Sequence, residues 1–202
     1  MPSVYTEAEI GKVEAAIHSK EKKRDYAVVL FASRLGFRSG DISRLTFDDV
    51  DFEKGVVRIT QQKTNARVEY ELLPEIRNAL RNYIDNERPR TFASNIFVTH
   101  NPPFKRLSLS VMGGIVSKGL KKAGINVGAR KRGPHAFRSS TASSMVNDNI
   151  PYEAVRKALG HTDLNAIKSY ARLDMEQLRA YALSVPEASG SFADLLSGRR
   201  VR

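Results

Sequence analysis

The residues best suited to chemistry in this 202-residue chain stand in short, separated segments. Two segments place a partner three positions on: Arg38 with Asp41 in GFRSGD, and His135 with Arg138 in GPHAFR. A guanidinium stays charged and pairs with phosphate through two hydrogen bonds, whereas an imidazole can accept or donate a proton near neutral pH. Together these side chains could bind a phosphodiester and move protons around it.

A third segment, ALGHTDLNAIKSYARL, adds a second imidazole and a phenol. His161 directly follows Gly160, which is expected to end a helix, and Tyr170 comes nine positions later. An ionised phenol oxygen is a nucleophile, so a tyrosine near cationic groups could attack phosphorus. The segment also fits an amphipathic helix with Leu164, Ile167 and Tyr170 on its buried face, and by itself it leaves both interpretations open.

Composition narrows the partners that the chain can have. Its formal net charge of +11 favours a polyanionic partner, and nucleic acid ahead of an anionic membrane. No run approaches the roughly 18 apolar residues of a spanning helix, and the N-terminus lacks a signal-peptide pattern. We therefore expect no membrane partner and a cytoplasmic protein.

The sequence also narrows the classes of catalysis. It has no cysteine, which removes thiol nucleophiles and thiolate metal sites. It has no His-Glu-x-x-His box, no clustered aspartates typical of a two-metal nuclease, and no Gly-x-Ser-x-Gly elbow of a serine hydrolase. We expect neither a metal nor another cofactor.

Hydrophobic periodicity predicts a mainly helical α+β fold, in which one compact domain carries a small antiparallel three-stranded β-sheet at one edge. A capping box of Thr6 and Glu9 opens the first helix. Strands are predicted at 56–60 and from 67, joined by a hairpin with Lys63 near its tip, with a third strand at 95–99. Further helices are predicted around 26–33, 74–84 and 110–123, from Pro134, and between Pro151 and Gly160.

Taken in order, these segments resemble the catalytic domain of the tyrosine recombinases, the phage integrase family. That family's pattern has an arginine in a Gly-apolar-Arg turn with a carboxylate three residues on, a hairpin lysine, a His-x-x-Arg box, a Leu-Gly-His box and a nucleophilic tyrosine. Every element occurs here, over about residues 5 to 183. By resemblance the catalytic residues are Arg38, Lys63, His135, Arg138, His161 and Tyr170, supported by Asp41.

Two departures from the family pattern stand out. Position 41 holds aspartate where many relatives have glutamate, which shortens the reach of the side chain but keeps its charge. Full-length relatives also carry a helical core-binding domain ahead of this region. We therefore expect a truncated chain: a C-terminal catalytic domain over residues 1–185 without the N-terminal core-binding domain, followed by a linker and tail at 186–202.

The resemblance implies a site-specific recombinase that cleaves and rejoins DNA through a covalent 3′-phosphotyrosyl intermediate, in integration or excision of a mobile element. Tyr170 is then the nucleophile, His135 accepts its proton, and Lys63 protonates the departing 5′-oxygen, a role for which Arg67 could compete. The remaining residues act on the pentacoordinate phosphorane or orient the groups that do. Arg38, Arg138 and His161 act on the phosphate, and Asp41 orients Arg38 or a neighbouring histidine.

Double-stranded DNA at an attachment or recombination site is the expected partner. The basic loop before Pro134 offers Arg130, Lys131 and Arg132 for contacts with the DNA backbone. The resemblance implies a homo-oligomer on DNA, a tetramer in the full-length protein. The tail at 186–202, with its apolar FADLL segment, is expected to be exchanged between protomers.

Two other functions compete with a recombinase. Residues 152–173 also fit a non-catalytic helix-turn-helix DNA-binding module, with Thr162, Asp163 and Asn165 at base edges. That function leaves Arg38 and the His-x-x-Arg box unexplained. A type IB topoisomerase-like enzyme would share the phosphotyrosine chemistry, but the Leu-Gly-His box and the compact size favour a recombinase.

Overall fold

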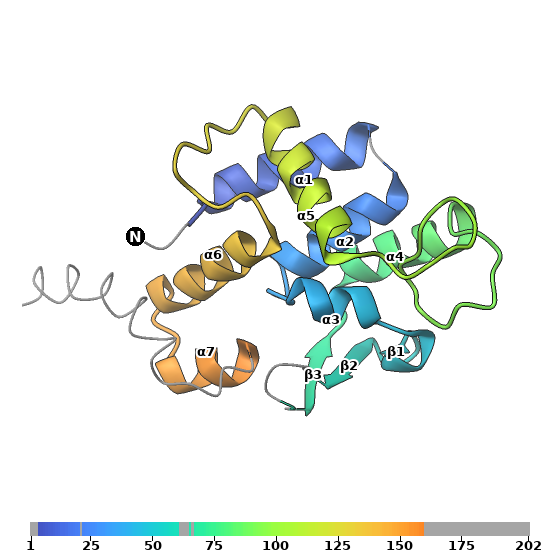
Figure 1. Ribbon diagram of the computed structural model, residues 1–202. Coiled ribbons are helices and arrows are strands. Elements are labelled where there is room, and N and C mark those ends of the chain that lie inside the picture. The colour runs from blue at the N-terminus through green and yellow to red at the C-terminus, as the bar shows by residue number, and fades with distance from the viewer. Residues whose placement is uncertain (1–3, 21, 61–64, 66, 160–202) are drawn as a thin grey trace, which may run out of the picture. The chain divides into compact units, whose positions relative to one another are not determined.

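The computed structural model of this chain describes residues 4–20, 22–60, 65 and 67–159 (Figure 1). The chain divides into a unit of Met1–Tyr170 and a unit of Ala171–Arg202, and the second unit lies outside the described residues. The expected domain boundary at residue 185 therefore stays a prediction. The described helices are α1 (Glu7–Lys20), α2 (Lys23–Ser33), α3 (Ser39–Arg44), α4 (Pro74–Asn86), α5 (Leu109–Lys122), α6 (Pro134–Asn147) and α7 (Tyr152–Leu159), with a short 3-10 helix η1 at Phe47–Asp49.

The first helix begins as the sequence predicts. The Thr6 amide donates to Glu9 Oε2 at 2.9 Å, and the Glu9 amide donates to Thr6 Oγ1 at 3.2 Å. This reciprocal capping satisfies two amides that have no partner inside the helix. Val13 and Ile17 on the next turns are buried, so α1 is fixed to the core along one face.

The sheet is three-stranded and antiparallel, which confirms the predicted α+β fold. Its order is β1 (Val50–Asp51), β2 (Val56–Thr60) and β3 (Arg67–Glu71), with Val57 opposite both Val50 and Tyr70. The strands lie at one edge of the helical unit, beyond α3 in the view of Figure 1. Both predicted hairpin strands are present.

The predicted third strand at 95–99 is wrong, because β1 takes that place in the sheet. Residues 95–99 form only isolated bridges, Thr46 with Asn95 and Val98 with Arg106. The three apolar residues of the segment, Ile96, Phe97 and Val98, are all fully buried. A run buried on every side crosses the core and lacks the alternation of a half-exposed strand.

Helix α2 is the centre of the core. It packs against α1, α4, α5 and α6. Phe31 on α2 meets Phe97 edge-on at 5.9 Å between ring centroids and Phe37 at 5.5 Å, and Phe37 in turn contacts Tyr70 of β3 at 4.7 Å. These contacts fix the backbone immediately before Arg38.

Helices α1 and α5 cross at a glycine that is expected to resist substitution. A Cβ at Gly119 would lie 2.5 Å from Ile17 Cδ1 and 2.9 Å from Val13 Cγ1, both in buried side chains. Val13 is β-branched and stiff, so the helices must move apart. We expect Gly119→Ala to lower the free energy of unfolding by about 1–3 kcal/mol, measured by urea denaturation.

A matched control lies on the same helix. Gly114 is exposed, and a Cβ there would meet nothing within 4 Å. Gly114→Ala is expected to raise the free energy of unfolding by roughly 0.5–1 kcal/mol through helix propensity alone. Equal effects of the two substitutions would show that the α1–α5 crossing is not limited by space.

Candidate active site

Arg38 lies at the turn between α2 and α3. It is the N-cap residue of α3, with extended backbone angles of φ −72° and ψ 144°, and its carbonyl accepts the Asp41 amide at 2.9 Å. Because Phe37 is buried on one side and α3 begins on the other, the position of Arg38 is set by the core. Its side chain is 22% exposed, so the guanidinium can reach a ligand.

Asp41 lies between two arginines. Its side chain is 3% exposed; Oδ2 is 4.0 Å from Arg38 Nη1, and Oδ1 accepts from Arg44 Nη2 at 3.2 Å. The predicted pair of Arg38 and Asp41 is therefore brought together. Arg44 was not predicted as a site residue, although its position three residues after Asp41 on one helix is a signal that could have found it.

Arg138 connects three segments at the centre of the site. The side chain is on α6 and is nearly fully buried. Its Nη1 donates to the Gly36 carbonyl at 2.6 Å, and its Nη2 donates to the Leu159 carbonyl at the end of α7. One guanidinium thus joins the turn before Arg38 to the last described residue before the Leu-Gly-His box.

Gly36, at this junction, cannot carry a side chain, both because of its backbone conformation and because there is no space for a Cβ. Gly36 has φ +61°, which side chains rarely tolerate, and a Cβ there would lie 2.9 Å from Leu159 Cδ2. The close approach lets the Gly36 and Leu159 carbonyls share Arg138. The glycine of the GFR turn therefore has a structural reason beyond the turn itself.

His135 lies on the first turn of α6 with an exposed side chain. Partial desolvation lowers its pKa below the ordinary value, and the positive charges of Lys131, Arg138 and Arg38 lower it further. The Ser139 hydroxyl lies 3.5 Å from His135 Nδ1 and donates to the His135 carbonyl at 3.1 Å. A lowered pKa keeps the imidazole neutral at pH 7, as a proton acceptor requires.

The structure therefore brings four predicted residues to one place, Arg38, Asp41, His135 and Arg138. The other three catalytic candidates, Lys63, His161 and Tyr170, lie outside the described residues, and their roles stay predictions. The same holds for the 186–202 tail and for Thr162, Asp163 and Asn165 of the helix-turn-helix alternative. Helix α7 ends at Leu159, one residue before the predicted stop at Gly160.

Arg130, predicted as a DNA contact, is engaged within the protein. Its Nη1 and Nη2 donate to the two carboxylate oxygens of Glu9 at 2.8 and 2.9 Å, and its guanidinium lies over the Tyr5 ring, 4.3 Å from the centroid. The hydrogen bonds from Arg130 are the main cause that lowers the Glu9 pKa. Arg130 thus ties the basic loop to the start of α1.

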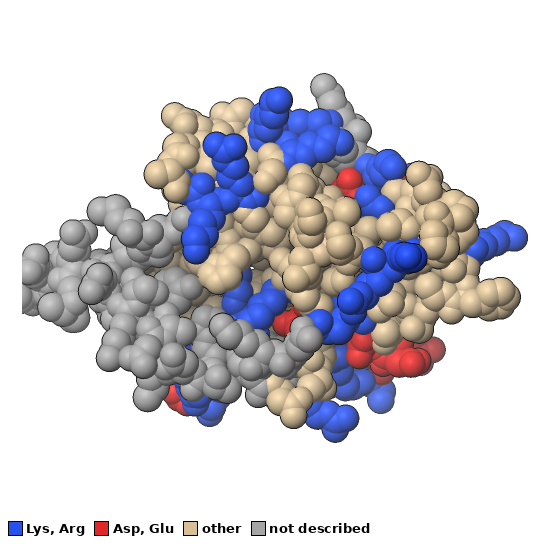
Figure 2. All heavy atoms as spheres, in the orientation of Figure 1, with Lys and Arg blue, Asp and Glu red and all other residues tan. Residues whose placement is uncertain are grey.

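Lys131 and Arg132 have exposed side chains on a loop whose backbone is held. The Tyr5 hydroxyl donates to the Lys131 carbonyl at 2.7 Å, and the Ser117 hydroxyl donates to the Arg132 carbonyl at 2.8 Å. Figure 2 shows that Lys and Arg predominate over Asp and Glu on one face of the molecule. A fixed backbone with outward cations suits contacts with a phosphate chain.

The charge of Lys131 makes a specific contribution to His135. Because that charge lowers the pKa of His135, Lys131→Gln is expected to raise it toward its ordinary value. His135 would then be protonated at a higher pH, and the acidic limb of a pH–rate profile would move the same way. The pKa of His135 can be measured by NMR, from the chemical shift of its ring protons as a function of pH.

Arg132→Gln is the control for this titration, because the Arg132 charge acts on Tyr5. It removes the same formal charge one residue away from Lys131. If both substitutions move the His135 titration equally, the effect of Lys131 is a general loss of charge and not a local one.

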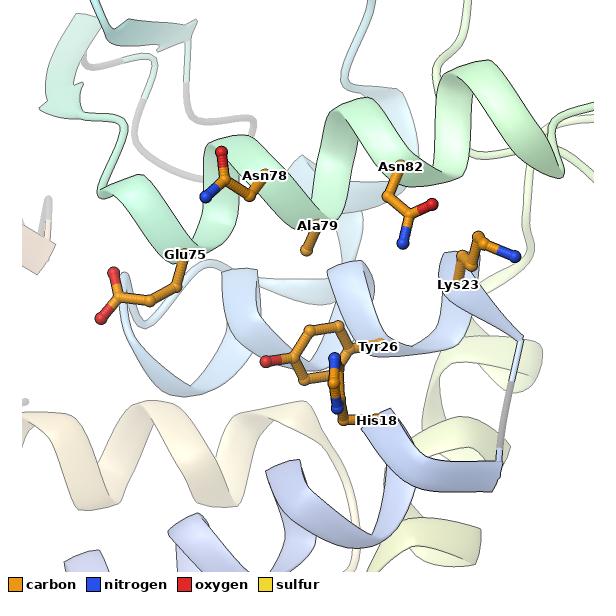
Figure 3. A pocket seen from close by; sticks show the side chains of 7 residues that line it. All are labelled: His18, Lys23, Tyr26, Glu75, Asn78, Ala79 and Asn82. Carbon is orange, nitrogen blue, oxygen red and sulfur yellow. The ribbon is translucent and has the colours of Figure 1, made fainter.

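Two cavities lie away from these residues. One of about 370 Å³ is lined by residues of α1, α2 and α4, among them His18, whose ring is tilted against Tyr26 at 4.6 Å (Figure 3). The other, of about 470 Å³, includes His100, which is partly buried with Nε2 3.3 Å from Glu87 Oε1. Neither lining includes a predicted catalytic residue.

Among the described residues, no group of three or more His, Cys, Asp or Glu side chains could hold a metal ion. None of the helices described is both long and apolar enough to cross a membrane.

Comparisons with known proteins agree with the geometry. The model of the Phage integrase family matches residues 4–177. A putative integrase/recombinase of Sinorhizobium fredii is 30% identical over 190 residues, which cover 92% of this chain and 97% of that protein. Tyrosine recombinase XerA of Pyrococcus furiosus is 29% identical over 183 residues, 89% of this chain and 60% of that protein. Two further Sinorhizobium fredii relatives are matched over only 39% and 38% of their length.

Solved structures share the fold. The crystal structure of XerA recombinase superposes with a TM-score of 0.74 at 23% identity, over 92% of this chain and 65% of that chain. The Tn1549 transposon integrase in complex with circular intermediate DNA gives a TM-score of 0.70 at 19% identity, over 88% of this chain and 68% of that chain. At these identities, the likeness concerns the fold alone.

Proposed function

This chain belongs to the phage integrase family, and we propose that it is the catalytic domain of a tyrosine-type site-specific DNA recombinase. The proposal rests above all on the junction at Arg138, where one buried guanidinium holds the turn before Arg38 and the end of α7. Two arginines and an imidazole with a lowered pKa from separate segments are the groups that phosphodiester cleavage needs.

In the proposed reaction, the Tyr170 phenol oxygen attacks phosphorus and the bond to the 5′-oxygen breaks. His135 takes the phenol proton and Lys63 gives a proton to the departing 5′-oxygen. The products are a 3′-phosphotyrosyl bond and a 5′-hydroxyl, and attack by the 5′-hydroxyl of another strand reverses the step. Because the phosphodiester energy stays in the covalent bond, no nucleotide or metal cofactor is required.

Arg38 and Arg138 are proposed to stabilise the extra negative charge of the phosphorane, together with His161. Charges that are already fixed before reaction stabilise a transition state best, because they need no reorganisation. The contact of Arg138 with two carbonyls supplies such fixation. Asp41 is proposed to orient Arg38, from which it is separated by 4.0 Å.

We further propose double-stranded DNA as the substrate, with Lys131 and Arg132 on its backbone and Arg130 serving to hold their loop. The wider setting is proposed from the family: a tetramer on DNA formed by the full-length protein, exchange of the 186–202 tail between protomers, mobilisation of a DNA element, and a site of action at the bacterial nucleoid. Solved structures of the same fold, a XerH recombinase bound to its difH substrate and the Tn1549 integrase in complex with DNA, support the DNA partner.

The test is covalent capture. The protein is incubated with a duplex of the element's attachment site that is nicked near the cleavage point, so that the 5′-hydroxyl fragment diffuses away. We expect a denaturant-resistant adduct, and after proteolysis a peptide containing Tyr170 linked to a 3′-phosphate. The experiment is repeated with a core-binding domain fused ahead of the chain. If both proteins bind the DNA and neither forms an adduct, the helix-turn-helix alternative is favoured.

A further inference from the structure

We propose that Arg44 is a positioning residue for DNA cleavage, acting on Arg38 through the carboxylate of Asp41. The inference rests on the proposed function, because Arg38 acts on the scissile phosphate there. Arg38, Asp41 and Arg44 follow one another at intervals of three along α3 and its N-cap. Their side chains therefore lie on neighbouring positions of one short helix.

The two arginines contact the carboxylate unequally. Arg44 Nη2 donates a hydrogen bond to Asp41 Oδ1 at 3.2 Å, whereas Arg38 Nη1 is 4.0 Å from Oδ2, beyond hydrogen-bond range. The carboxylate is nearly fully buried, so its charge is weakly screened by water. The geometry makes Arg44 the nearer counterion and leaves Arg38 a longer ion pair.

This division of contacts matters for the phosphate. A buried carboxylate with only one arginine in reach would draw that guanidinium into a close pair and offset its charge. With Arg44 in contact, one negative charge is shared between two positive ones. Arg38 is then oriented by Asp41 while the pair of arginines keeps a net positive charge beside the phosphate.

The position of Arg44 is itself fixed. Its carbonyl accepts the Asn95 side-chain amide at 3.1 Å, and the next residue, Leu45, is buried. Its side chain is 33% exposed, compared with 22% for Arg38. Asp41 is buried, so Arg44→Gln is expected to cost some stability as well, and the cleavage rate of folded protein at saturation separates a role beside Arg38 from that cost.

The experiment measures single-turnover cleavage of the nicked duplex at saturating and limiting protein. Arg44→Gln is expected to slow cleavage at saturation by about 10- to 100-fold, by analogy with residues that orient the ligands of a metal site, with DNA affinity little changed. Arg44→Lys keeps the charge near Asp41 and should recover most of the rate. Arg58→Gln, which removes a charge that pairs with Glu69 on the sheet, should cleave like wild type.

A double-mutant cycle identifies the route of the effect. If Arg44 acts through Asp41, Arg44→Gln costs nothing further in an Asp41→Asn background. Additive losses would overturn the inference, and so would a loss confined to DNA affinity, which would make Arg44 a plain DNA contact. If Arg44→Gln unfolds, Arg44→Met, which keeps the aliphatic stem without the charge, takes its place. A slowed rate at saturation supports the inference, whereas a wild-type rate with a lowered melting temperature would leave only a structural role.

The controls separate this inference from the proposed function. If wild-type protein forms no adduct, the proposed function fails. If wild type cleaves and Arg44→Gln cleaves equally fast, only the role of Arg44 fails.

Discussion

Replacing Tyr170 by phenylalanine is expected to abolish the covalent protein–DNA adduct. The substitution removes one oxygen, the atom that forms the phosphotyrosyl bond, and leaves the rest of the side chain in place. No other group can substitute, because the intermediate is defined by that bond. Adduct on the nicked duplex should fall to background in a denaturing gel, while a gel shift without denaturant stays as in wild type.

Tyr26→Phe is the matched control for the nucleophile. Tyr26 lies on α2 and lines the cavity of Figure 3, away from the predicted site residues, and burial raises its pKa, which makes its phenol harder to ionise. The adduct should form as in wild type. If the adduct still forms with Tyr170→Phe, the nucleophile is a residue other than Tyr170.

Arg138→Ala is expected to damage both cleavage and stability. Losing one fixed donor to a developing oxyanion lowers a rate by about 10²–10³. The same change leaves the buried Gly36 and Leu159 carbonyls without this donor, at about 1–3 kcal/mol each, so the free energy of unfolding should fall by roughly 2–6 kcal/mol. Single-turnover cleavage and urea denaturation measure the two effects.

Two variants sharpen this prediction. Arg138→Lys keeps the positive charge but cannot present a planar fork to two carbonyls, so it should recover part of the rate and little of the stability. Arg156→Ala removes a partly exposed arginine of α7 that pairs with the exposed Glu153, and its unfolding should be close to that of wild type. Wild-type stability of Arg138→Ala would mean that the two carbonyls find other donors.

Local patterns in the sequence predicted much of the fold. The Thr6–Glu9 capping box and the hairpin strands depend on neighbouring residues, and the structure has both. The 95–99 segment was assigned wrongly because a fully buried apolar run has no periodicity that separates a strand from a core crossing. The actual third strand, Val50–Asp51, has two residues, too few for any pattern.

The site shows the same division between local and distant information. The motif spacing pointed to Arg38, Asp41, His135 and Arg138, and the fold brings them together. The internal role of Arg130 could not be predicted, because its partner Glu9 is 121 residues away in the sequence. The sequence of the loop predicts DNA contacts for all three of its basic residues alike. Only the tertiary contacts distinguish the arginine that packs inside the protein from its exposed neighbours.

The two carbonyls held by Arg138 have a thermodynamic consequence. The guanidinium that is proposed to bind phosphate also bonds the backbone at the end of α7, so the two equilibria share one side chain. The two equilibria are then linked in both directions. A change that strengthens the hydrogen bond to Leu159 alters the free energy of phosphate binding, and bound phosphate alters the free energy of docking α7 by the same amount. Hydrogen exchange in α7, with and without DNA, would measure this coupling.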